Sequence, residues 1–193
     1  MPDFRSHTLY LVRHGECEHN AAGWAAGHDD SPLTAKGREQ ARANGRLLAQ
    51  IADVTALDFH ASSLHRTCTT MELLREAAGL PPNGYRADGR LMEGNLGDHA
   101  RVPVEAFLRH EGYAADPWNY VRPNGESYAM IFARVSRFLE TLTRDSVIVT
   151  HYGPAWMIHT HTLGIKPGSA AQWRPPHAGI MRLSGGTETF FGE

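Results

Sequence analysis

Short runs typical of buried strands alternate with helical segments along this chain, and this alternation constrains the fold more than any other feature. Three runs are apolar and rich in β-branched or aromatic residues, namely Thr8–Val12, Leu57–Ser62 and Ser146–Thr150. Each run is followed by a stretch that favours a helix, which is typical of a parallel sheet between helical layers. We therefore predict an α/β fold, a three-layer α/β/α sandwich around a mostly parallel, doubly wound sheet.

Capping signals and apolar spacing predict where the helices lie. Thr34 is a suitable N-cap for a helix from Ala35 to about Ile51, and the helix that follows the second strand begins after Ser62 or Ser63 and stops before Gly79. The clearest helical periodicity runs from Glu126 to about Arg144. A further helix begins near Gly153 and Pro154.

The remaining segments complete the predicted organisation. Residues 180–183 and 187–191 form a hairpin through Gly185 and Gly186. Residues 98–125 are interpreted as an insertion over the active-site edge of one domain that spans residues 1–193. Because all the apolar stripes are needed for the core, the oligomeric state cannot be predicted.

Composition excludes several classes of function. The net charge is −2, no basic run occurs and no segment is apolar enough to span a membrane, so we expect no nucleic-acid partner and no membrane association. No signal-peptide pattern opens the chain, and the spacing of Cys17 and Cys68 suits reduced thiols. We expect a cytoplasmic protein.

The twelve histidines raise the question of a metal. The closest pair, His159 and His161, lies on a predicted helix, where a spacing of two points the side chains in nearly opposite directions. No pairing of the His-Glu-x-x-His or Cys-x-x-Cys type occurs elsewhere. We expect no metal site and no cofactor.

Cationic and imidazole side chains follow the ends of all three predicted strands. The residues at these ends are Arg13 and His14, Ser62 with Arg66 four residues on, and His151. Parallel strands bring their carboxyl ends to one edge of the sheet, where ligands bind. A cluster of this kind suits a phosphate dianion, and His14 is a candidate nucleophile because a neutral imidazole is available near pH 7. The sequence predicts a phosphate site.

Five blocks in order resemble the histidine phosphatase superfamily, in the branch that also contains cofactor-dependent phosphoglycerate mutases. The blocks are Arg13-His14-Gly15-Glu16 with Asn20, Asp30 to Thr34 with Gly37, Ser62 to Thr67, Leu91-Met92-Glu93 with Gly97, and Val147 to His151. The resemblance implies that His14 is phosphorylated, that Arg13, Arg66 and His151 bind the phosphoryl group, and that Glu93 donates a proton to the leaving group. It also implies that Asn20 contacts the phosphate.

The residues expected around the rim of the site depart from the pattern of this superfamily. Ala25 and Ala26 stand where an arginine and a glutamine are common, His99 begins a segment that usually reads Trp-Glu-Gly, and Tyr152 follows the second histidine. We predict that Tyr152 and His28 bind substrate. Trp24, His99 and His177 are weaker candidates, and Trp24 and His177 are interpreted as packing or loop residues.

The sequence favours hydrolysis over phosphoryl transfer to a second alcohol. A mutase must shield its phosphohistidine from water with lids and a covering tail, and only 32 residues separate Glu93 from Glu126, with two after Phe191. We expect a metal-independent phosphatase acting on a small phosphorylated metabolite. A cofactor-dependent phosphoglycerate mutase is the nearest alternative, and a non-catalytic phosphate-binding or regulatory protein is an alternative of another class.

Overall fold

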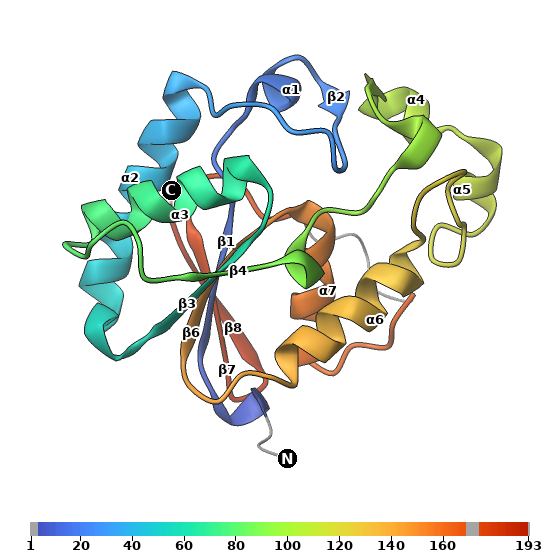
Figure 1. Cartoon of the computed structure of the whole chain (residues 1–193). Helices are drawn as coiled ribbons and strands as arrows, with labels where there is room; N and C mark the ends of the chain where they lie inside the picture. Colours follow the sequence, from blue (N-terminus) through green and yellow to red (C-terminus); the bar gives the residue numbers. More distant parts are fainter. Residues whose placement is uncertain (1–3, 169–173, 193) are drawn as a thin grey trace.

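A central sheet of six strands organises the computed structural model, which describes residues 4–168 and 174–192 (Figure 1). The strands lie in the order β4-β3-β6-β1-β7-β8. Their bounds are β1 Leu9–Arg13, β3 Asp58–Ser62, β4 Arg86–Asp88, β6 Ser146–Thr150, β7 Ile180–Ser184 and β8 Thr187–Phe191.

Strands β4, β3, β6 and β1 are parallel, whereas β7 pairs antiparallel with β1 and β8 pairs antiparallel with β7. The sheet is therefore mostly parallel, as predicted. The hairpin predicted through Gly185 and Gly186 is present and forms one edge of the sheet.

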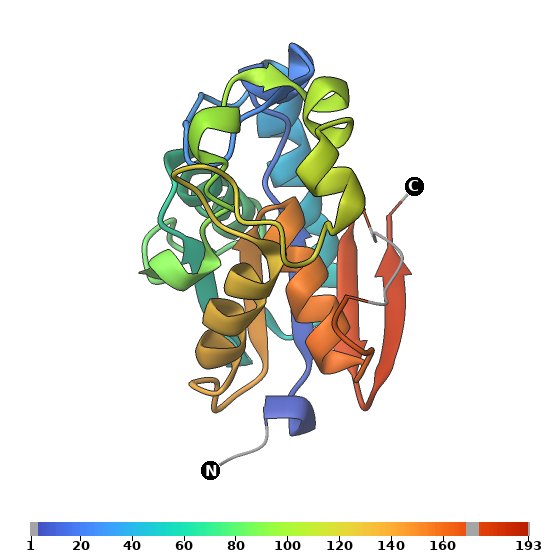
Figure 2. The same cartoon turned by 90° about the vertical axis from the view of Figure 1, so that its right-hand side faces the viewer.

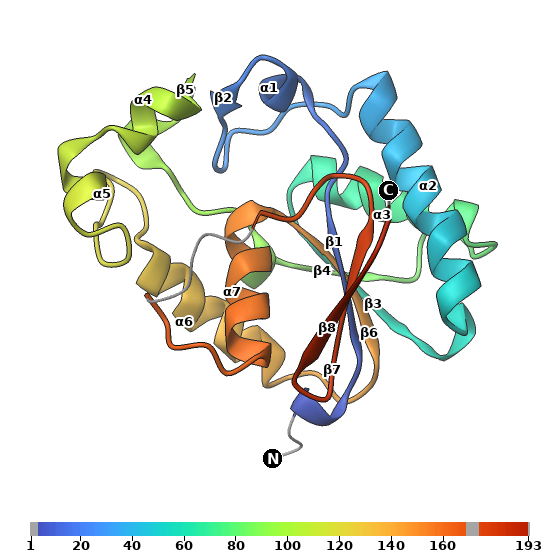
Figure 3. The ribbon, with the colours of Figure 1, turned by 180° about the vertical axis from the view of Figure 1, so that it is seen from behind.

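Helices cover both faces of the sheet, as Figure 1 and the view from behind in Figure 3 show. Side chains of β1 alternate between two apolar clusters: Leu9 and Leu11 pack into one, and Tyr10 and Val12 into the other. The first cluster includes residues of α6 and α7, and the second includes residues of α2 and α3. These helices are α2 Ala35–Ile51, α3 His65–Ala77, α6 Tyr128–Leu139 and α7 Tyr152–Thr162. The predicted sandwich is confirmed.

Two glycines bring α2 close to the residues that follow β1. The Thr34 side chain accepts a hydrogen bond from the Gly37 N–H at 3.0 Å and caps α2, as predicted. A β-carbon at Gly37 would lie 1.9 Å from the Glu16 carbonyl oxygen, and one at Gly15 would lie 2.2 Å from the Gly37 carbonyl oxygen. Backbone therefore packs directly on backbone beside His14.

Two predicted helix boundaries are wrong. Helix α3 begins at His65 with Leu64 as its N-cap residue, because the Ser62 hydroxyl is bonded to the His151 ring instead of capping the helix. Helix α6 ends at Leu139 and not near Arg144. There the Thr141 hydroxyl donates to the Phe138 carbonyl at 2.6 Å, which satisfies a helix-terminal acceptor, and the chain turns toward β6.

Smaller elements that the sequence did not predict lie near the carboxyl edge of the sheet and around its periphery. A second sheet pairs β2 Trp24–Ala25 with β5 Val102–Pro103, and in Figure 2 this part of the chain lies at the end of the molecule opposite the N-terminus. The short helices are α1 Glu18–Ala21, α4 Val104–Leu108 and α5 Glu111–Ala115, with 3-10 turns η1 Phe4–Ser6, η2 Val54–Ala56, η3 Gly89–Leu91 and η4 Gly97–His99. No helix in the described ranges is long and apolar enough to cross a membrane.

Candidate active site

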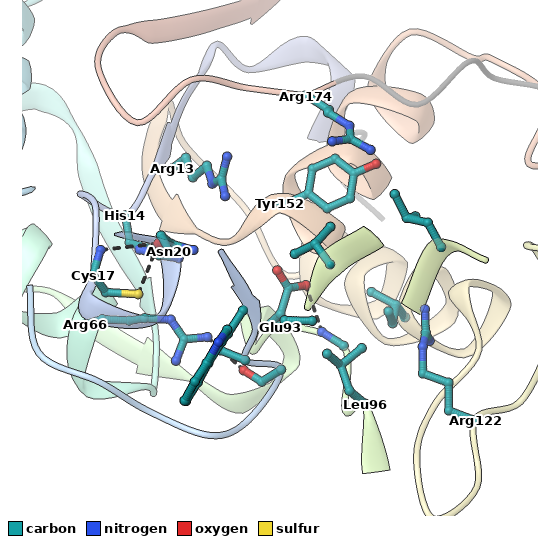
Figure 4. Close-up of a pocket in the computed structure, with 18 of the residues that line it drawn as sticks. Arg13, His14, Cys17, Asn20, Arg66, Glu93, Leu96, Arg122, Tyr152 and Arg174 are labelled. Carbon is teal, nitrogen blue, oxygen red and sulfur yellow. Dashed lines mark hydrogen bonds between the residues drawn. The ribbon is translucent and has the colours of Figure 1, made fainter. Parts of the chain in front are cut away.

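The carboxyl ends of β1, β3 and β6 meet beside a cavity of about 210 Å³ (Figure 4). Arg13 pairs with Thr150 across β1 and β6, so that His14 and His151 follow at the same edge. The structure thus brings together the strand ends that the sequence singled out. Among the predicted site residues, those that line the cavity are Arg13, His14, Asn20, Arg66, Glu93 and Tyr152, together with the weaker candidate Trp24. His151 is not a lining residue and lies behind His14 in this edge of the sheet.

His14 is a buried imidazole with one ring nitrogen already bonded. Nδ1 lies 2.8 Å from the Gly15 carbonyl oxygen, and because a carbonyl only accepts, Nδ1 carries the proton. Burial, followed by the charges of Arg66 and Arg13, holds the pKa of His14 well below its usual range. The ring is therefore neutral at pH 7, with an electron pair on Nε2.

Arg66 is held rigidly by acceptors from a single loop. Nη1 donates to Asp30 Oδ1 at 2.9 Å and to the Asp29 carbonyl at 3.3 Å, and Nη2 donates to the Gly27 carbonyl at 2.8 Å. The side chain is only 2% exposed. Its Nε is buried without a hydrogen-bond partner in the described part of the chain, and the residue lines the cavity.

Arg13 and His151 complete the group around His14. Arg13 Nη1 donates to the Pro175 carbonyl at 3.2 Å, and burial lowers the pKa of the guanidinium. His151 Nε2 lies 2.8 Å from Ser62 Oγ, its ring centroid lies 5.0 Å from that of His14, and burial holds its pKa well below the usual range. Arg13 Nε and His151 Nδ1 are also buried without a partner among the described residues.

Glu93 faces the cavity from the loop after η3. Its Oε1 accepts from the Gly94 N–H at 2.8 Å and from the Gly153 N–H at 3.1 Å. Figure 4 shows the carboxylate between the Arg66 side and the Tyr152 side of the cavity. It is thus oriented by backbone groups from two segments.

Asn20, Tyr152 and His28 have different surroundings. Asn20 Oδ1 accepts from the Cys17 N–H at 3.2 Å and from its thiol at 3.0 Å, at the cavity wall. Tyr152 also lines the cavity, and burial raises the pKa of its hydroxyl to about 12. His28 is not among the lining residues; its Nε2 lies 2.8 Å from the Glu93 carbonyl oxygen. His28 therefore contacts the Glu93 backbone rather than the cavity.

The outer wall of the cavity is largely apolar and joins segments far apart in the sequence. It includes Trp24, Leu96, Val104, Leu108 and Ile131. The two loops that carry part of it are tied together by the β2–β5 pair and by Arg101, which donates from Nε and Nη2 to the two carboxylate oxygens of Asp29 at 2.5 and 2.9 Å. Arg101 has φ of 61°, a backbone conformation uncommon for a side-chain-bearing residue.

Sequence reasoning missed some residues beside the site and gave His177 only as a weaker candidate. Arg122 and Arg174 line the cavity, and neither has a motif around it that marks it. His177, interpreted as a loop residue, lies with its Nδ1 2.6 Å from the His14 carbonyl oxygen. Asn44 is buried on α2, as Ala41 and Leu48 are. A polar residue among the buried apolar positions of this helix was the signal that could have marked Asn44.

The histidines outside the site are engaged separately. His159 Nε2 lies 2.5 Å from Glu188 Oε2 on β8, and His161 Nδ1 lies 3.0 Å from Ser136 Oγ on α6. Within residues 4–168 and 174–192, no three His, Cys, Asp or Glu side chains are grouped to hold a metal ion. The chemistry at the cavity is that of a neutral imidazole facing guanidinium groups.

Comparisons with known proteins find similarity over most of the chain. The family model of the histidine phosphatase superfamily (branch 1) matches residues 9–191. An adenosylcobalamin/alpha-ribazole phosphatase of Salmonella typhimurium is 30% identical, with 86% of this chain and 84% of that protein covered. A probable phosphoglycerate mutase, GpmB, of Salmonella paratyphi C is 33% identical, with 91% and 83% covered.

Solved structures give the same result. The crystal structure of the alpha-ribazole phosphatase from Shigella flexneri superposes with a TM-score of 0.80 at 25% identity, covering 96% of this chain and 95% of that one. Bacillus stearothermophilus YhfR superposes with a TM-score of 0.75 at 26% identity, covering 97% and 96%. The similarity thus extends over almost the whole chain.

Proposed function

This chain belongs to the histidine phosphatase superfamily, and we propose that it is a metal-independent phosphatase that hydrolyses a small phosphomonoester through a phosphohistidine on His14. The superfamily supports phosphatase or mutase chemistry without naming a substrate. The observation that carries the proposal is the neutral His14 ring, with Nδ1 bonded to Gly15 and Nε2 unprotonated, beside Arg13 and the buried Arg66.

In the proposed first step, His14 Nε2 attacks phosphorus and the bond to the leaving oxygen breaks. The guanidinium groups of Arg13 and Arg66, which line the cavity, bind the transferring phosphoryl oxygens, where a fixed cation stabilises the charge that develops. We assign His151 to the same phosphoryl group, because its ring lies beside that of His14 and its Nδ1 has no partner among the described residues. Since phosphoryl transfer demands mainly positioning and charge stabilisation, these groups supply what a metal provides elsewhere.

Glu93 is proposed as the acid and then the base of the reaction. An alkoxide leaves poorly unless it is protonated as it departs, so an acid must lie near the leaving oxygen. Glu93 lines the cavity with His14 and is oriented by the Gly94 and Gly153 N–H groups. In the second step the same carboxylate takes a proton from the water that attacks the phosphohistidine.

The shape of the cavity supports a small ester whose alcohol has an apolar surface. A volume of about 210 Å³ lies below the roughly 300–1,000 Å³ of sites for drug-sized ligands. Beyond the cations, the wall consists of side chains such as Trp24, Leu96 and Leu108. The alpha-ribazole phosphatases among the relatives are named for an organic substrate. We extend to this chain only the general class, a phosphate ester of an organic alcohol.

The test is phosphate release from p-nitrophenyl phosphate with excess chelator. We expect turnover that the chelator leaves unchanged, together with an acid-labile phosphoryl label on His14. Turnover that the chelator abolishes would contradict the metal-independent mechanism.

Two further assays address the alternatives. A GpmB relative favours a mutase, which would interconvert phosphoglycerates with a bisphosphate primer and release little phosphate. A non-catalytic phosphate-binding protein would bind inorganic phosphate without labelling His14.

A further inference from the structure

We propose that His177 is a positioning residue for His14: its Nδ1–H holds the peptide group between His14 and Gly15, and thereby sets the direction of the attacking imidazole. The contact joins residues 163 positions apart, with Nδ1 2.6 Å from the His14 carbonyl oxygen. The inference rests on the proposed function of His14 as the nucleophile.

The His14–Gly15 peptide is held at both of its polar groups. Its carbonyl accepts from His177 Nδ1, and its N–H donates to Thr70 Oγ1 at 3.1 Å. Thr70 in turn donates its hydroxyl proton to the Arg66 carbonyl at 2.7 Å. The plane of this peptide is therefore determined by a side chain on each side, one of them bonded to the backbone of a phosphate-binding arginine.

The orientation of that peptide controls the His14 ring through Gly15. The His14 ring is fixed by the hydrogen bond from its Nδ1 to the Gly15 carbonyl. That carbonyl belongs to the same residue whose N–H is part of the peptide that His177 holds. A rotation of the peptide would move this acceptor and let the ring turn or change tautomer. Because an in-line attack tolerates little misplacement, a shift of this kind slows the reaction without weakening substrate binding equally.

His177 is itself held in a defined place. Its backbone carbonyl accepts from Asn44 Nδ2 at 3.3 Å, and Asn44 Oδ1 accepts from the Gly179 N–H at 2.8 Å. Asn44 is 2% exposed on α2. The same segment supplies the Pro175 carbonyl to Arg13 Nη1. Residues 175–179 thus contact the backbone of His14 and the side chain of Arg13 from one side.

A direct role of His177 in substrate binding fits the geometry less well. Its Nδ1 is already bonded to the His14 carbonyl oxygen, whereas His151 keeps a ring nitrogen, Nδ1, without a partner among the described residues. Nδ1 must carry the proton, because the carbonyl that it contacts can only accept. The hydrogen bond to the His14 carbonyl therefore requires an N–H donor at position 177. It does not require a side chain that changes its protonation state.

Two substitutions of similar size separate the donor from the bulk of the side chain. His177→Asn keeps an N–H donor on the atom next to Cγ, as in Nδ1 of histidine, whereas His177→Leu has no donor. His65→Ala, at an exposed position, controls for loss of a histidine. The measurements are kcat and KM for p-nitrophenyl phosphate, the folded fraction at the assay temperature, and the 15N shifts of the His14 ring.

We expect His177→Leu to lower kcat about tenfold or more with KM changed less than about twofold, and the two His14 ring nitrogens to move toward averaged shifts. His177→Asn should restore most of kcat and the shifts of an Nδ1–H tautomer. Wild-type kcat and ring shifts in His177→Leu would overturn the proposal. Equal losses in both variants, matched by loss of folded protein, would overturn it as well.

Failure of the proposed function is distinct from failure of the positioning role. The proposed function fails if the wild-type protein hydrolyses no phosphomonoester. The ring shifts still decide the positioning role in that case, since they are measured without substrate. Unchanged His14 shifts in His177→Leu would then overturn the inference, and averaged shifts that His177→Asn reverses would support it.

Discussion

The Glu93 carboxylate accepts a hydrogen bond from the Gly153 N–H at 3.1 Å, and this contact depends on the absence of a side chain at position 153. A β-carbon there would lie 2.5 Å from Glu93 Oε1. The first turn of α7, which follows His151, therefore positions the group that we propose as the acid.

Glu93→Gln should discriminate between leaving groups. The amide keeps the size of the side chain but cannot donate a carboxylic proton, so hydrolysis of an alkyl phosphate should fall by about a hundredfold or more. p-Nitrophenyl phosphate has a leaving group that needs no proton, and we expect its first step to slow much less. Phosphohistidine formation by rapid quench measures this step for both esters; an equal loss for both would contradict the assignment.

Arg66→Ala should reduce turnover by about a hundredfold or more, the scale for loss of one transition-state donor. Asp30→Asn is the companion variant, because Asp30 Oδ1 accepts from Arg66 Nη1 at 2.9 Å. It should give a smaller loss, since the Gly27 and Asp29 carbonyls still hold the guanidinium. Steady-state kinetics checks both. If Arg66→Ala lowers thermal stability but leaves kcat/KM unchanged, Arg66 has no role in catalysis.

His14→Ala should abolish both phosphate release and the acid-labile label. The physical reason is that the neutral ring supplies the attacking electron pair, and alanine supplies none. His65→Ala serves as the control and should label and turn over like the wild type. Mass spectrometry of rapidly quenched protein locates the label; a label that persists in His14→Ala would show that another residue is the nucleophile.

Stability should fall as pH decreases from about 7 to 5. His14, His151 and His177 have pKa values lowered from 6.5 by burial, to about 4 for His177. Below pH 6.5 the unfolded chain binds protons that the folded chain does not, so the free energy of unfolding decreases, by up to about 1.4 kcal/mol per pH unit for each such histidine. Well above pH 6.5 these groups are neutral in both states and contribute no slope.

Urea unfolding at pH 7.5, 6 and 5 measures this slope. His177→Asn removes one of the titrating groups and keeps the hydrogen bond, so it should lose less stability over the same interval than the wild type does. A wild-type free energy of unfolding that is constant or rises toward pH 5 would show that these histidines are protonated in the folded state.

Trp24→Ala should weaken the preference of this protein for phosphate esters with an apolar alcohol over those with a polar alcohol. Trp24 is 42% exposed, lies on β2 at the cavity wall and stacks on His19 with ring centroids 5.8 Å apart. Because the side chain is half in solvent, its removal should change stability by less than about 1 kcal/mol. KM should rise severalfold for an aryl phosphate and little for glycerol phosphate. A parallel rise for both esters would indicate that Trp24 shapes the loop rather than contacts the alcohol.

The sequence predicted those parts of the fold that depend on local pattern. The β1, β3 and β6 strands, the Thr34 cap of α2 and the hairpin at Gly185 all have strong periodicity or turn signals. Strand β4 was missed because three residues, Arg86–Asp88, carry no periodicity. Helix α6 was predicted too long because Leu142 continues the apolar spacing, although it packs into the core from the turn beyond the helix.

The candidate site could likewise be predicted from the sequence only where local pattern determines it. Arg13, His14, Arg66 and His151 follow strand ends, and that placement needs only the order of strands and helices. His177 and Asn44 could not be assigned in this way, because their roles depend on contacts between segments more than 130 residues apart. His28 was expected at the substrate but contacts the Glu93 carbonyl, a difference of side-chain direction that no spacing reveals.

The contact between Gly15 and Gly37 bears on how this protein can be engineered. No other amino acid fits at either position, because backbone atoms of the opposite segment occupy the space. The backbone beside His14 therefore leaves a designer no room for a side chain at these two positions. Trp24, Val104 and Leu108, by contrast, come from β2 and α4, which lie outside the main sheet. New substrates are best sought through libraries at these rim positions, with the catalytic end left unchanged.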